Sequence, residues 1–297
     1  MSQCVKTNKI SVGKPRWLRR SLPTGPEYEK IRNLLKGNDL TTVCQEAKCP
    51  NQFECYGKGT ATFMILGDNC TRNCRFCAVG NNVTGLPDPK EPVRVAEAVI
   101  LLSLRYAVVT SVTRDDMADG GAQLFAETIH AIREKSPKTL VEVLIPDLQG
   151  NKEALETILN AEPDVLNHNI ETVAGLYPKV RPQAIYQRSL ELLRRVKQMR
   201  PKIPTKTGIM LGLGETFAEL EKTWQDLLDA GCDILTMGQY LQPSANHLAV
   251  ERFVPPEEFE ELGEKALALG FSGVASGPFV RSSYKAEKLY RKAIRRI

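Results

Sequence analysis

Long hydrophobic runs are absent from this sequence, and so is the pattern of a secretory signal. The first residues, MSQCVKTNKISVGKPRW, contain no apolar core of signal-peptide length, and the longest apolar runs, such as AVILLSL, are too short to span a bilayer. We therefore expect a cytoplasmic protein that does not bind a membrane. The net charge of +5 is too small to indicate a nucleic-acid partner, and it is compatible with an acidic protein partner.

Histidine is scarce, whereas cysteine is concentrated in one part of the chain. Six of the eight cysteines form two triplets, spaced C-x4-C-x5-C and C-x3-C-x2-C. The first triplet is Cys44, Cys49 and Cys55, and the second is Cys70, Cys74 and Cys77. In a reducing compartment such clustering indicates metal ligation or redox chemistry rather than a disulfide framework. Each triplet supplies three thiolates where a closed metal site uses four ligands.

Zinc binding and simple electron transfer are the alternative interpretations of these triplets. Zinc sites usually contain C-x2-C pairs with a nearby histidine, and His130, His168 and His247 are all far from the triplets in sequence. Ferredoxin-type carriers provide four cysteines for each cluster in characteristic runs. A cubane cluster that leaves one iron without a protein ligand therefore fits C-x3-C-x2-C better than either alternative.

Short strand-like runs alternate with amphipathic helical stretches from Thr60 onward. The series begins with TATFMILG and VRVAEAVILLSLR, ends with DILTMGQY and PEEFEELGEKALALG, and amounts to about six βα units. Repeated βα units imply parallel strands, because each helix must cross over to bring the next strand into register. Both an open doubly wound sheet and a complete or partial barrel satisfy this pattern. Polar and glycine residues collect after several strands, at 68–75, 115–121, 167–171 and 212–215, which favours a barrel.

The second triplet resembles the signature loop of the radical S-adenosylmethionine enzymes, because C-x3-C-x2-C has an aromatic residue, Phe76, before its last cysteine. In that family the open iron of a [4Fe-4S] cluster is chelated by the amino and carboxylate groups of S-adenosylmethionine. One electron then splits the sulfonium and releases a 5′-deoxyadenosyl radical. The resemblance implies that the ligand missing from Cys70, Cys74 and Cys77 is S-adenosylmethionine itself.

Further motifs resemble those of the lipoyl synthase family along nearly the whole chain, from KPRWLRR onward. They are TVCQEAKCPNQFEC, SVTRDDMADGGA, LNHNIET, KTGIMLGLGE and SGPFVRSSY. In that family an auxiliary [4Fe-4S] cluster is held by C-x4-C-x5-C and by a serine of an R-S-S-Y motif. The resemblance therefore implies Cys44, Cys49, Cys55 and Ser283 as ligands, with Ser282 the less favoured serine.

The resemblance also implies an activity, partners and cofactor contacts. The activity is insertion of two sulfur atoms, at C6 and C8, into an octanoyl chain on a lysine of a lipoyl carrier domain, with the auxiliary cluster as sulfur donor. The electron would come from a donor such as ferredoxin or flavodoxin. The candidate contacts to S-adenosylmethionine are Phe76, Asp119, Gly120, Gly121, Asn169, Glu171, Arg181 and Gly212. Taken alone, the Gly-Gly pair and Gly212 would indicate ordinary turns.

The sequence thus predicts an α/β protein built on a partial (β/α)6 TIM-type barrel over residues 60–275. Residues 1–59 form an N-terminal extension with the auxiliary cluster ligands, and residues 276–297 form a C-terminal closing segment whose basic end begins as a helix. Two alternatives stay open. One is another two-cluster radical enzyme, biotin-synthase-like or methylthio-transferring, and the other is a protein that carries clusters without turnover.

Overall fold

The computed structural model describes residues 14–19, 62–82 and 85–297, together with positions 29, 33, 42, 46, 49, 51, 54 and 55. One predicted cluster ligand, Cys44, lies outside the described residues. The segment PEYEKIRNLLKG, whose pattern of apolar residues predicts a short helix, lies mostly outside them as well. The division of the chain into an extension, a barrel and a closing segment stays a prediction.

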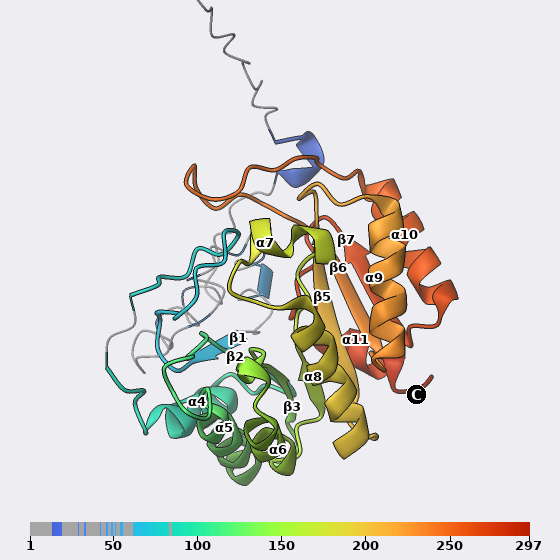
Figure 1. The fold of residues 1–297 in the computed structure, drawn as a ribbon. Helices are drawn as coiled ribbons and strands as arrows, with labels where there is room; N and C mark the ends of the chain where they lie inside the picture. Colours follow the sequence, from blue (N-terminus) through green and yellow to red (C-terminus); the bar gives the residue numbers. More distant parts are fainter. Residues whose placement is uncertain are drawn as a thin grey trace, which may run out of the picture.

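Seven parallel strands form one curved sheet in which the strands follow one another in sequence order (Figure 1). They are β1 (Thr62–Ile65), β2 (Tyr106–Ser111), β3 (Leu140–Leu144), β4 (Val165–Asn167), β5 (Thr205–Leu211), β6 (Ile234–Gln239) and β7 (Gly273–Gly277). Within the described residues no ladder joins β1 to β7, so the barrel stays open. A doubly wound sheet would reverse the strand order at a switch point. The prediction of a partial barrel is therefore confirmed, and the doubly wound alternative is wrong.

A helix follows each of the first six strands and covers the outer face of the sheet (Figure 1). These helices are α4 (Glu91–Leu101), α5 (Ala122–Lys135), α6 (Lys152–Asn160), α8 (Tyr186–Met199), α9 (Phe217–Asp229) and α10 (Pro256–Leu269). The shorter elements are η1 (Arg16–Leu18), η2 (Leu148–Gly150), η3 (Ala174–Leu176), α7 (Tyr177–Val180) and α11 (Ala286–Ala293). The main core lies between strands and outer helices, where Val143 and Leu235 belong to one buried cluster with Phe125 and Trp224. None of the described helices is long and apolar enough to cross a membrane.

The C-terminal segment covers the inner face of the sheet. The predicted basic helix is present as α11, and its apolar side is buried: Leu289 and Ala293 pack with Ile234 of β6, and Ala286 packs with Val108 of β2. Strand β7, which precedes this segment, was not anticipated because its sequence, GVASG, contains a single β-branched residue.

A buried ion pair between Glu142 and Lys206 also lies on this inner face, because Glu142 alternates along β3 with valines of the outer core. Lys206 Nζ is 2.8 and 3.0 Å from the two carboxylate oxygens of Glu142. The same carboxylate accepts hydrogen bonds from Tyr106 Oη at 2.6 Å and from Asn167 Nδ2 at 2.9 Å. Burial and the Glu142 charge raise the pKa of Tyr106 well above its usual value, which keeps this hydroxyl a donor. Four strands are thereby joined through one carboxylate.

We expect Lys206→Met to destabilise the fold by about 3–5 kcal/mol, because it leaves the Glu142 charge buried without its cation. The urea midpoint of the cluster-reconstituted protein measures this loss. Lys222→Met is the control, since Lys222 forms a surface pair with Asp226 and its side chain is 72% exposed. A Lys206→Met variant no less stable than the control would show that the pair does not hold the strands together.

Candidate active site

The second cysteine triplet lies on a closed loop that follows β1. The backbone N–H of Cys70 donates to the carbonyl of Gly80 at 2.7 Å, and Asn69 forms an isolated bridge with Gly80. A Cβ atom on Gly80 would lie 2.4 Å from Asn69 Oδ1, so this closure requires glycine. The loop carries Cys70, Cys74 and Cys77, and their role as cluster ligands stays a prediction.

The sulfur atoms of this loop occupy a site suited to cluster ligation. Cys70 Sγ accepts hydrogen bonds from the backbone N–H groups of Arg72 and Thr113, at 3.4 and 3.3 Å. Burial raises the pKa of the Cys74 thiol, and it raises the pKa of the Cys77 thiol to about 12. The backbone N–H of Cys77 donates to the Cys74 carbonyl at 3.0 Å, so these two cysteines share one tight turn. Bound iron would ionise such thiols, which is the condition for ligation.

A single zinc ion fits the described residues poorly. Among them, no three His, Cys, Asp or Glu side chains converge as the ligands of one ion would. The cysteines of a cubane each bind a different iron, so they need not converge in this way. Both ring nitrogens of His168 and of His247 are engaged in hydrogen bonds of 2.8–2.9 Å, and His130 is exposed on α5.

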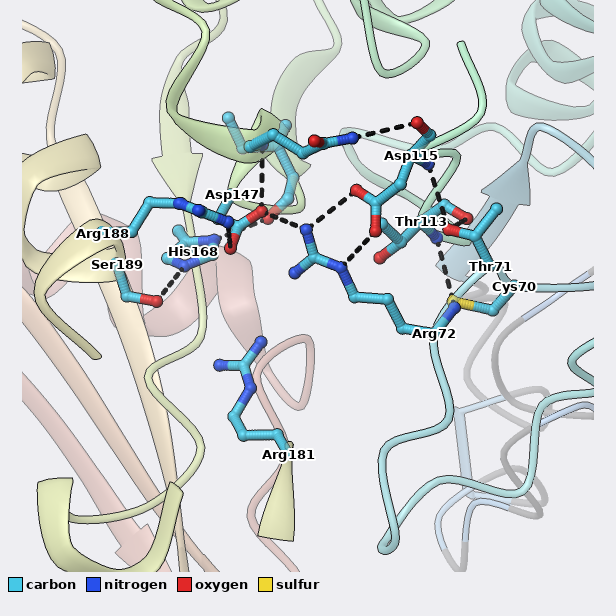
Figure 2. Close-up of polar contacts among 12 residues, drawn as sticks. Cys70, Thr71, Arg72, Thr113, Asp115, Asp147, His168, Arg181, Arg188 and Ser189 are labelled. Carbon is cyan, nitrogen blue, oxygen red and sulfur yellow. Dashed lines mark hydrogen bonds and ion pairs between the residues drawn. The ribbon is translucent and has the colours of Figure 1, made fainter. Parts of the chain in front are cut away.

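Arg72, between the first two cysteines of the loop, joins the loop to the ends of two strands (Figure 2). Its Nε and Nη2 atoms donate to the two carboxylate oxygens of Asp115 at 2.6 and 2.9 Å, and Nη2 also donates to Asp147 at 2.6 Å. The Arg72 side chain is only 3% exposed. Burial acts to raise the pKa of Asp147, but the hydrogen bond and charge of Arg72 lower it to about 2. Asp147 is therefore held as an anion.

These three residues were not predicted as a group from the sequence. Two features of the sequence could have indicated this contact. One is an arginine inside the cysteine loop, and the other is an aspartate soon after each of two adjacent strands. Their pairing depends on the sheet, because the carboxyl ends of adjacent parallel strands meet at one edge. Asp147 also lies 3.5 Å from Arg188 of α8, so the contact extends to a further helix.

Asp119, Gly120 and Gly121 form the turn that starts α5. The two carboxylate oxygens of Asp119 accept backbone N–H bonds from Gly121 and Gln123, each of 2.9 Å. The two glycines have φ angles of +60° and +88°, a left-handed conformation that favours glycine. A Cβ atom on Gly121 would lie 2.2 Å from the side chain of Leu66. The motif thus has a clear role as a turn, and its contact with a cofactor stays a prediction.

Asn169, Glu171 and Arg181 meet beyond the end of β4. Asn169 Nδ2 donates to Glu171 Oε1 at 3.0 Å, and Arg181 Nη1 donates to the Asn169 carbonyl at 2.9 Å. Burial raises the pKa of Glu171, although Arg181 opposes that shift. The backbone N–H of Arg75 donates to the Val180 carbonyl at 2.9 Å, which places this group beside the cysteine loop. Glu171 has a φ of +66°, a strained value for this residue type.

Phe76 and Gly212 have structural contacts of their own. Phe76 packs against a buried cluster that contains Val180 and Tyr240, which anchors the end of the cysteine loop. The N–H of Gly212 donates to Glu215 Oε1 at 2.6 Å, and its φ is +95°. A Cβ atom on Gly212 would lie 2.3 Å from the Arg252 carbonyl, so the strand-to-helix turn requires glycine. A cofactor contact at either residue stays a prediction.

Residues shortly before β1 and residues of the C-terminal segment meet at a cavity of about 340 Å³, whose lining includes Cys55 and Ser283. Tyr284 Oη donates to both carboxylate oxygens of Glu54, at 3.0 and 3.1 Å. Asn51 Nδ2 donates to the Phe279 carbonyl at 2.6 Å, and Cys49 is half-buried nearby in sequence. Ser282 lies elsewhere, since its hydroxyl donates to Asn169 Oδ1 at 2.9 Å.

Residues 64–227 match the radical SAM superfamily, and residues 2–49 match the N-terminal domain of lipoyl synthase. The lipoyl synthase of Desulfotalea psychrophila is 70% identical over 288 residues, which cover 97% of this chain and 96% of that protein. The chain belongs to the lipoyl synthase family. The lipoyl synthase of Symbiobacterium thermophilum is 59% identical over 95% of this chain and 88% of its own length.

Solved structures of other proteins share the fold. HydG, a maturase of the [FeFe]-hydrogenase, superposes with a TM-score of 0.58 at 15% identity, covering 77% of this chain and 54% of its own. Methylornithine synthase gives a TM-score of 0.52 at 15% identity, covering 76% and 67%. At such identities the likeness shows the fold alone. Membership of the lipoyl synthase family and the radical SAM superfamily implies a [4Fe-4S] cluster and S-adenosylmethionine.

We expect Arg72→Lys to reduce cleavage of S-adenosylmethionine by about 10- to 100-fold, as is typical when a residue that orients metal ligands is changed. Lysine keeps the charge but cannot reproduce the fork that spans Asp115 and Asp147. Iron content and 5′-deoxyadenosine formation measure the effect. The control is Arg133→Lys, which alters a 2.9 Å pair with Asp164 at the opposite end of the sheet. Equal iron content and equal turnover in the two variants would show that Arg72 does not position the cysteine loop.

Proposed function

We propose that this chain is a lipoyl synthase that inserts sulfur at C6 and C8 of a protein-bound octanoyl-lysine, with an auxiliary [4Fe-4S] cluster as sulfur donor. The observation that carries the proposal is the cavity lined by both Cys55 and Ser283. It joins parts of the chain that the family resemblance assigns to one auxiliary cluster. The match of residues 2–49 to the N-terminal domain of lipoyl synthase supports the same conclusion.

Cys70, Cys74 and Cys77 would hold the cluster that binds S-adenosylmethionine. When bound, the two groups supply hydrogen abstraction from unactivated C–H bonds, which no side-chain base could deprotonate. Arg72 fixes the loop that presents the thiolates. Phe76 anchors the other end of this loop.

Arg181 is the candidate with the best support for contact with the cofactor carboxylate. Its Nε atom is buried and has no hydrogen-bond partner among the described residues. A carboxylate would satisfy this donor with a charge-assisted bond. Asn169 and Glu171 would line the same site, because both contact or face Arg181. For Asp119, Gly120, Gly121 and Gly212 the proposal rests on the family resemblance together with their positions after β2 and β5.

Cys44, Cys49, Cys55 and Ser283 would ligate the auxiliary cluster. A serine oxygen is a harder ligand than a thiolate and suits a cluster that must release sulfide. The substrate would be an octanoylated lipoyl carrier domain, and a donor such as ferredoxin or flavodoxin would supply electrons. The absence of a nucleic-acid partner and the cytoplasmic location stay predictions from the sequence.

The alternative is another two-cluster radical enzyme that inserts sulfur, such as a biotin-synthase-like one. Enzymes of that kind differ in where the ligands of the second cluster lie. A protein that only carries clusters would have no use for Arg181 and the polar residues beside the cysteine loop.

The decisive experiment incubates the reconstituted protein anaerobically with S-adenosylmethionine, a reductant and an octanoyl-lysine peptide. Mass spectrometry should show the gain of two sulfur atoms.

We expect Cys74→Ala to abolish 5′-deoxyadenosine formation while the auxiliary cluster still assembles, because each triplet is local in sequence. Cys49→Ala should retain deoxyadenosine formation but give no dithiolated product. Deoxyadenosine from Cys74→Ala, or dithiolated peptide from Cys49→Ala, would contradict the assignment.

The two serines of the R-S-S-Y motif provide a separate test. We expect Ser283→Ala to impair sulfur insertion while radical formation continues, because Ser283 lines the cavity with Cys55. Ser282→Ala should affect sulfur insertion less, since its hydroxyl bonds to Asn169. The measurements are the ratio of dithiolated peptide to deoxyadenosine and the Mössbauer spectrum of the auxiliary cluster. If Ser282→Ala alone changes that spectrum, the choice of Ser283 is wrong.

A further inference from the structure

A basic groove lies along α11, close to the cavity that contains Ser283. We define it by the six residues that line a hollow of about 490 Å³, of which five are cations and one is a carboxylate: Arg105, Glu287, Lys288, Arg291, Lys292 and Arg295. The whole chain carries a net charge of only +5. Positive charge is therefore concentrated on this face.

The one carboxylate of the basic groove is already paired. Glu287 lies 3.5 Å from Arg105 and 3.0 Å from Arg291. Among the described residues, no carboxylate lies within ion-pair distance of Lys288, Lys292 or Arg295. These three side chains are exposed, and the apolar side of α11 is buried against the strands, which fixes their direction toward solvent.

The basic groove is continuous with the cavity that contains Cys55 and Ser283, because Arg105, Glu287 and Lys288 line both. The interior of that cavity is largely apolar, with Leu102, Leu104, Tyr106 and Val108 in its lining. Its volume of about 340 Å³ falls within the usual range for small-ligand sites, about 300–1,000 Å³. The cations of the basic groove thus lie at one side of a cavity whose apolar lining suits an alkyl chain.

We propose that the basic groove docks the acidic surface of a carrier domain, so that the octanoylated lysine of that domain enters the neighbouring cavity. This inference rests on the proposed function and adds the surface by which the substrate protein is recognised. Charge complementarity of this kind raises the association rate and selects partners. A nucleic acid is a poorer fit, because the groove lining contains no aromatic side chain on which bases could stack.

Charge reversal separates docking from catalysis. The test variant carries Lys288→Glu, Lys292→Glu and Arg295→Glu, and the control carries Lys138→Glu, Lys152→Glu and Lys222→Glu at exposed positions outside the groove. Each protein is assayed with an octanoylated carrier domain that is acidic around its lysine, and with a short neutral octanoyl-lysine peptide.

We expect the test variant to raise the KM for the carrier domain about tenfold or more, which corresponds to about 1.4 kcal/mol, while turnover of the peptide stays unchanged. The control should match the unmodified protein with both substrates. Added salt should raise the KM of the unmodified protein for the carrier domain. The KM values of the unmodified protein and the test variant should therefore become more similar as salt is added. An unchanged carrier KM, or an equal loss with carrier and peptide, would overturn the proposal.

Binding of the octanoylated carrier, measured by fluorescence anisotropy, does not depend on turnover. Charge-dependent binding without any sulfur insertion by the unmodified protein would sink the proposed function and leave the docking surface standing. Binding of RNA or anionic vesicles that is lost in the test variant, with carrier binding unchanged, would assign the groove to a different partner and refute the inference.

Discussion

The contact of Arg72 with Asp115 and Asp147 is the interaction on which the rest of the candidate site depends. The cysteine loop has no regular secondary structure, so its geometry must come from contacts with the barrel. A guanidinium has donors in a rigid fork, and here that fork spans carboxylates after two adjacent strands. Because Arg72 and Asp147 are both buried, loss of Arg72 would leave the Asp147 carboxylate with only the more distant Arg188 as its cation. The loop is therefore held in one position relative to the strand ends.

The same strand ends bring the remaining polar residues to the loop. Glu171 follows β4, and Arg181 follows α7, yet both charges act on Cys74. On the other side of this group, Ser282 of the C-terminal segment bonds to Asn169. Both serines lie in the turn that leads into α11, and Ser283 lines the cavity with Cys55. One short segment thus contacts both the polar group beside the cysteine loop and the cavity that contains Cys55.

Local features of the site could be predicted from sequence, whereas features that depend on the sheet could not. The spacing of Cys70, Cys74 and Cys77 placed them on one loop, and the βα periodicity gave six of the seven strands. Strand β7 was missed because GVASG has little β propensity, and only its pairing with β6 makes it a strand. The partners of Arg72 are separated from it by 43 and 75 residues, so no local pattern identifies them. Asp119 and Gly212 each form hydrogen bonds that stabilise a turn of the backbone. A sequence motif alone does not show whether such a residue stabilises the turn, contacts a cofactor or does both.

The two proposed cluster sites differ in how their ligands are brought together. The ligands on the β1 loop are close in sequence and fixed by an ion pair to the barrel, so this site forms when the strand ends form. The auxiliary site requires contacts such as Glu54 with Tyr284, which are 230 residues apart. Such a contact closes a very long loop and can form only after the barrel has brought the C-terminal segment across its inner face. A sulfur-donating cluster at that position could be dismantled and rebuilt by separating two chain segments, while the outer core and the Arg72 contact stay intact.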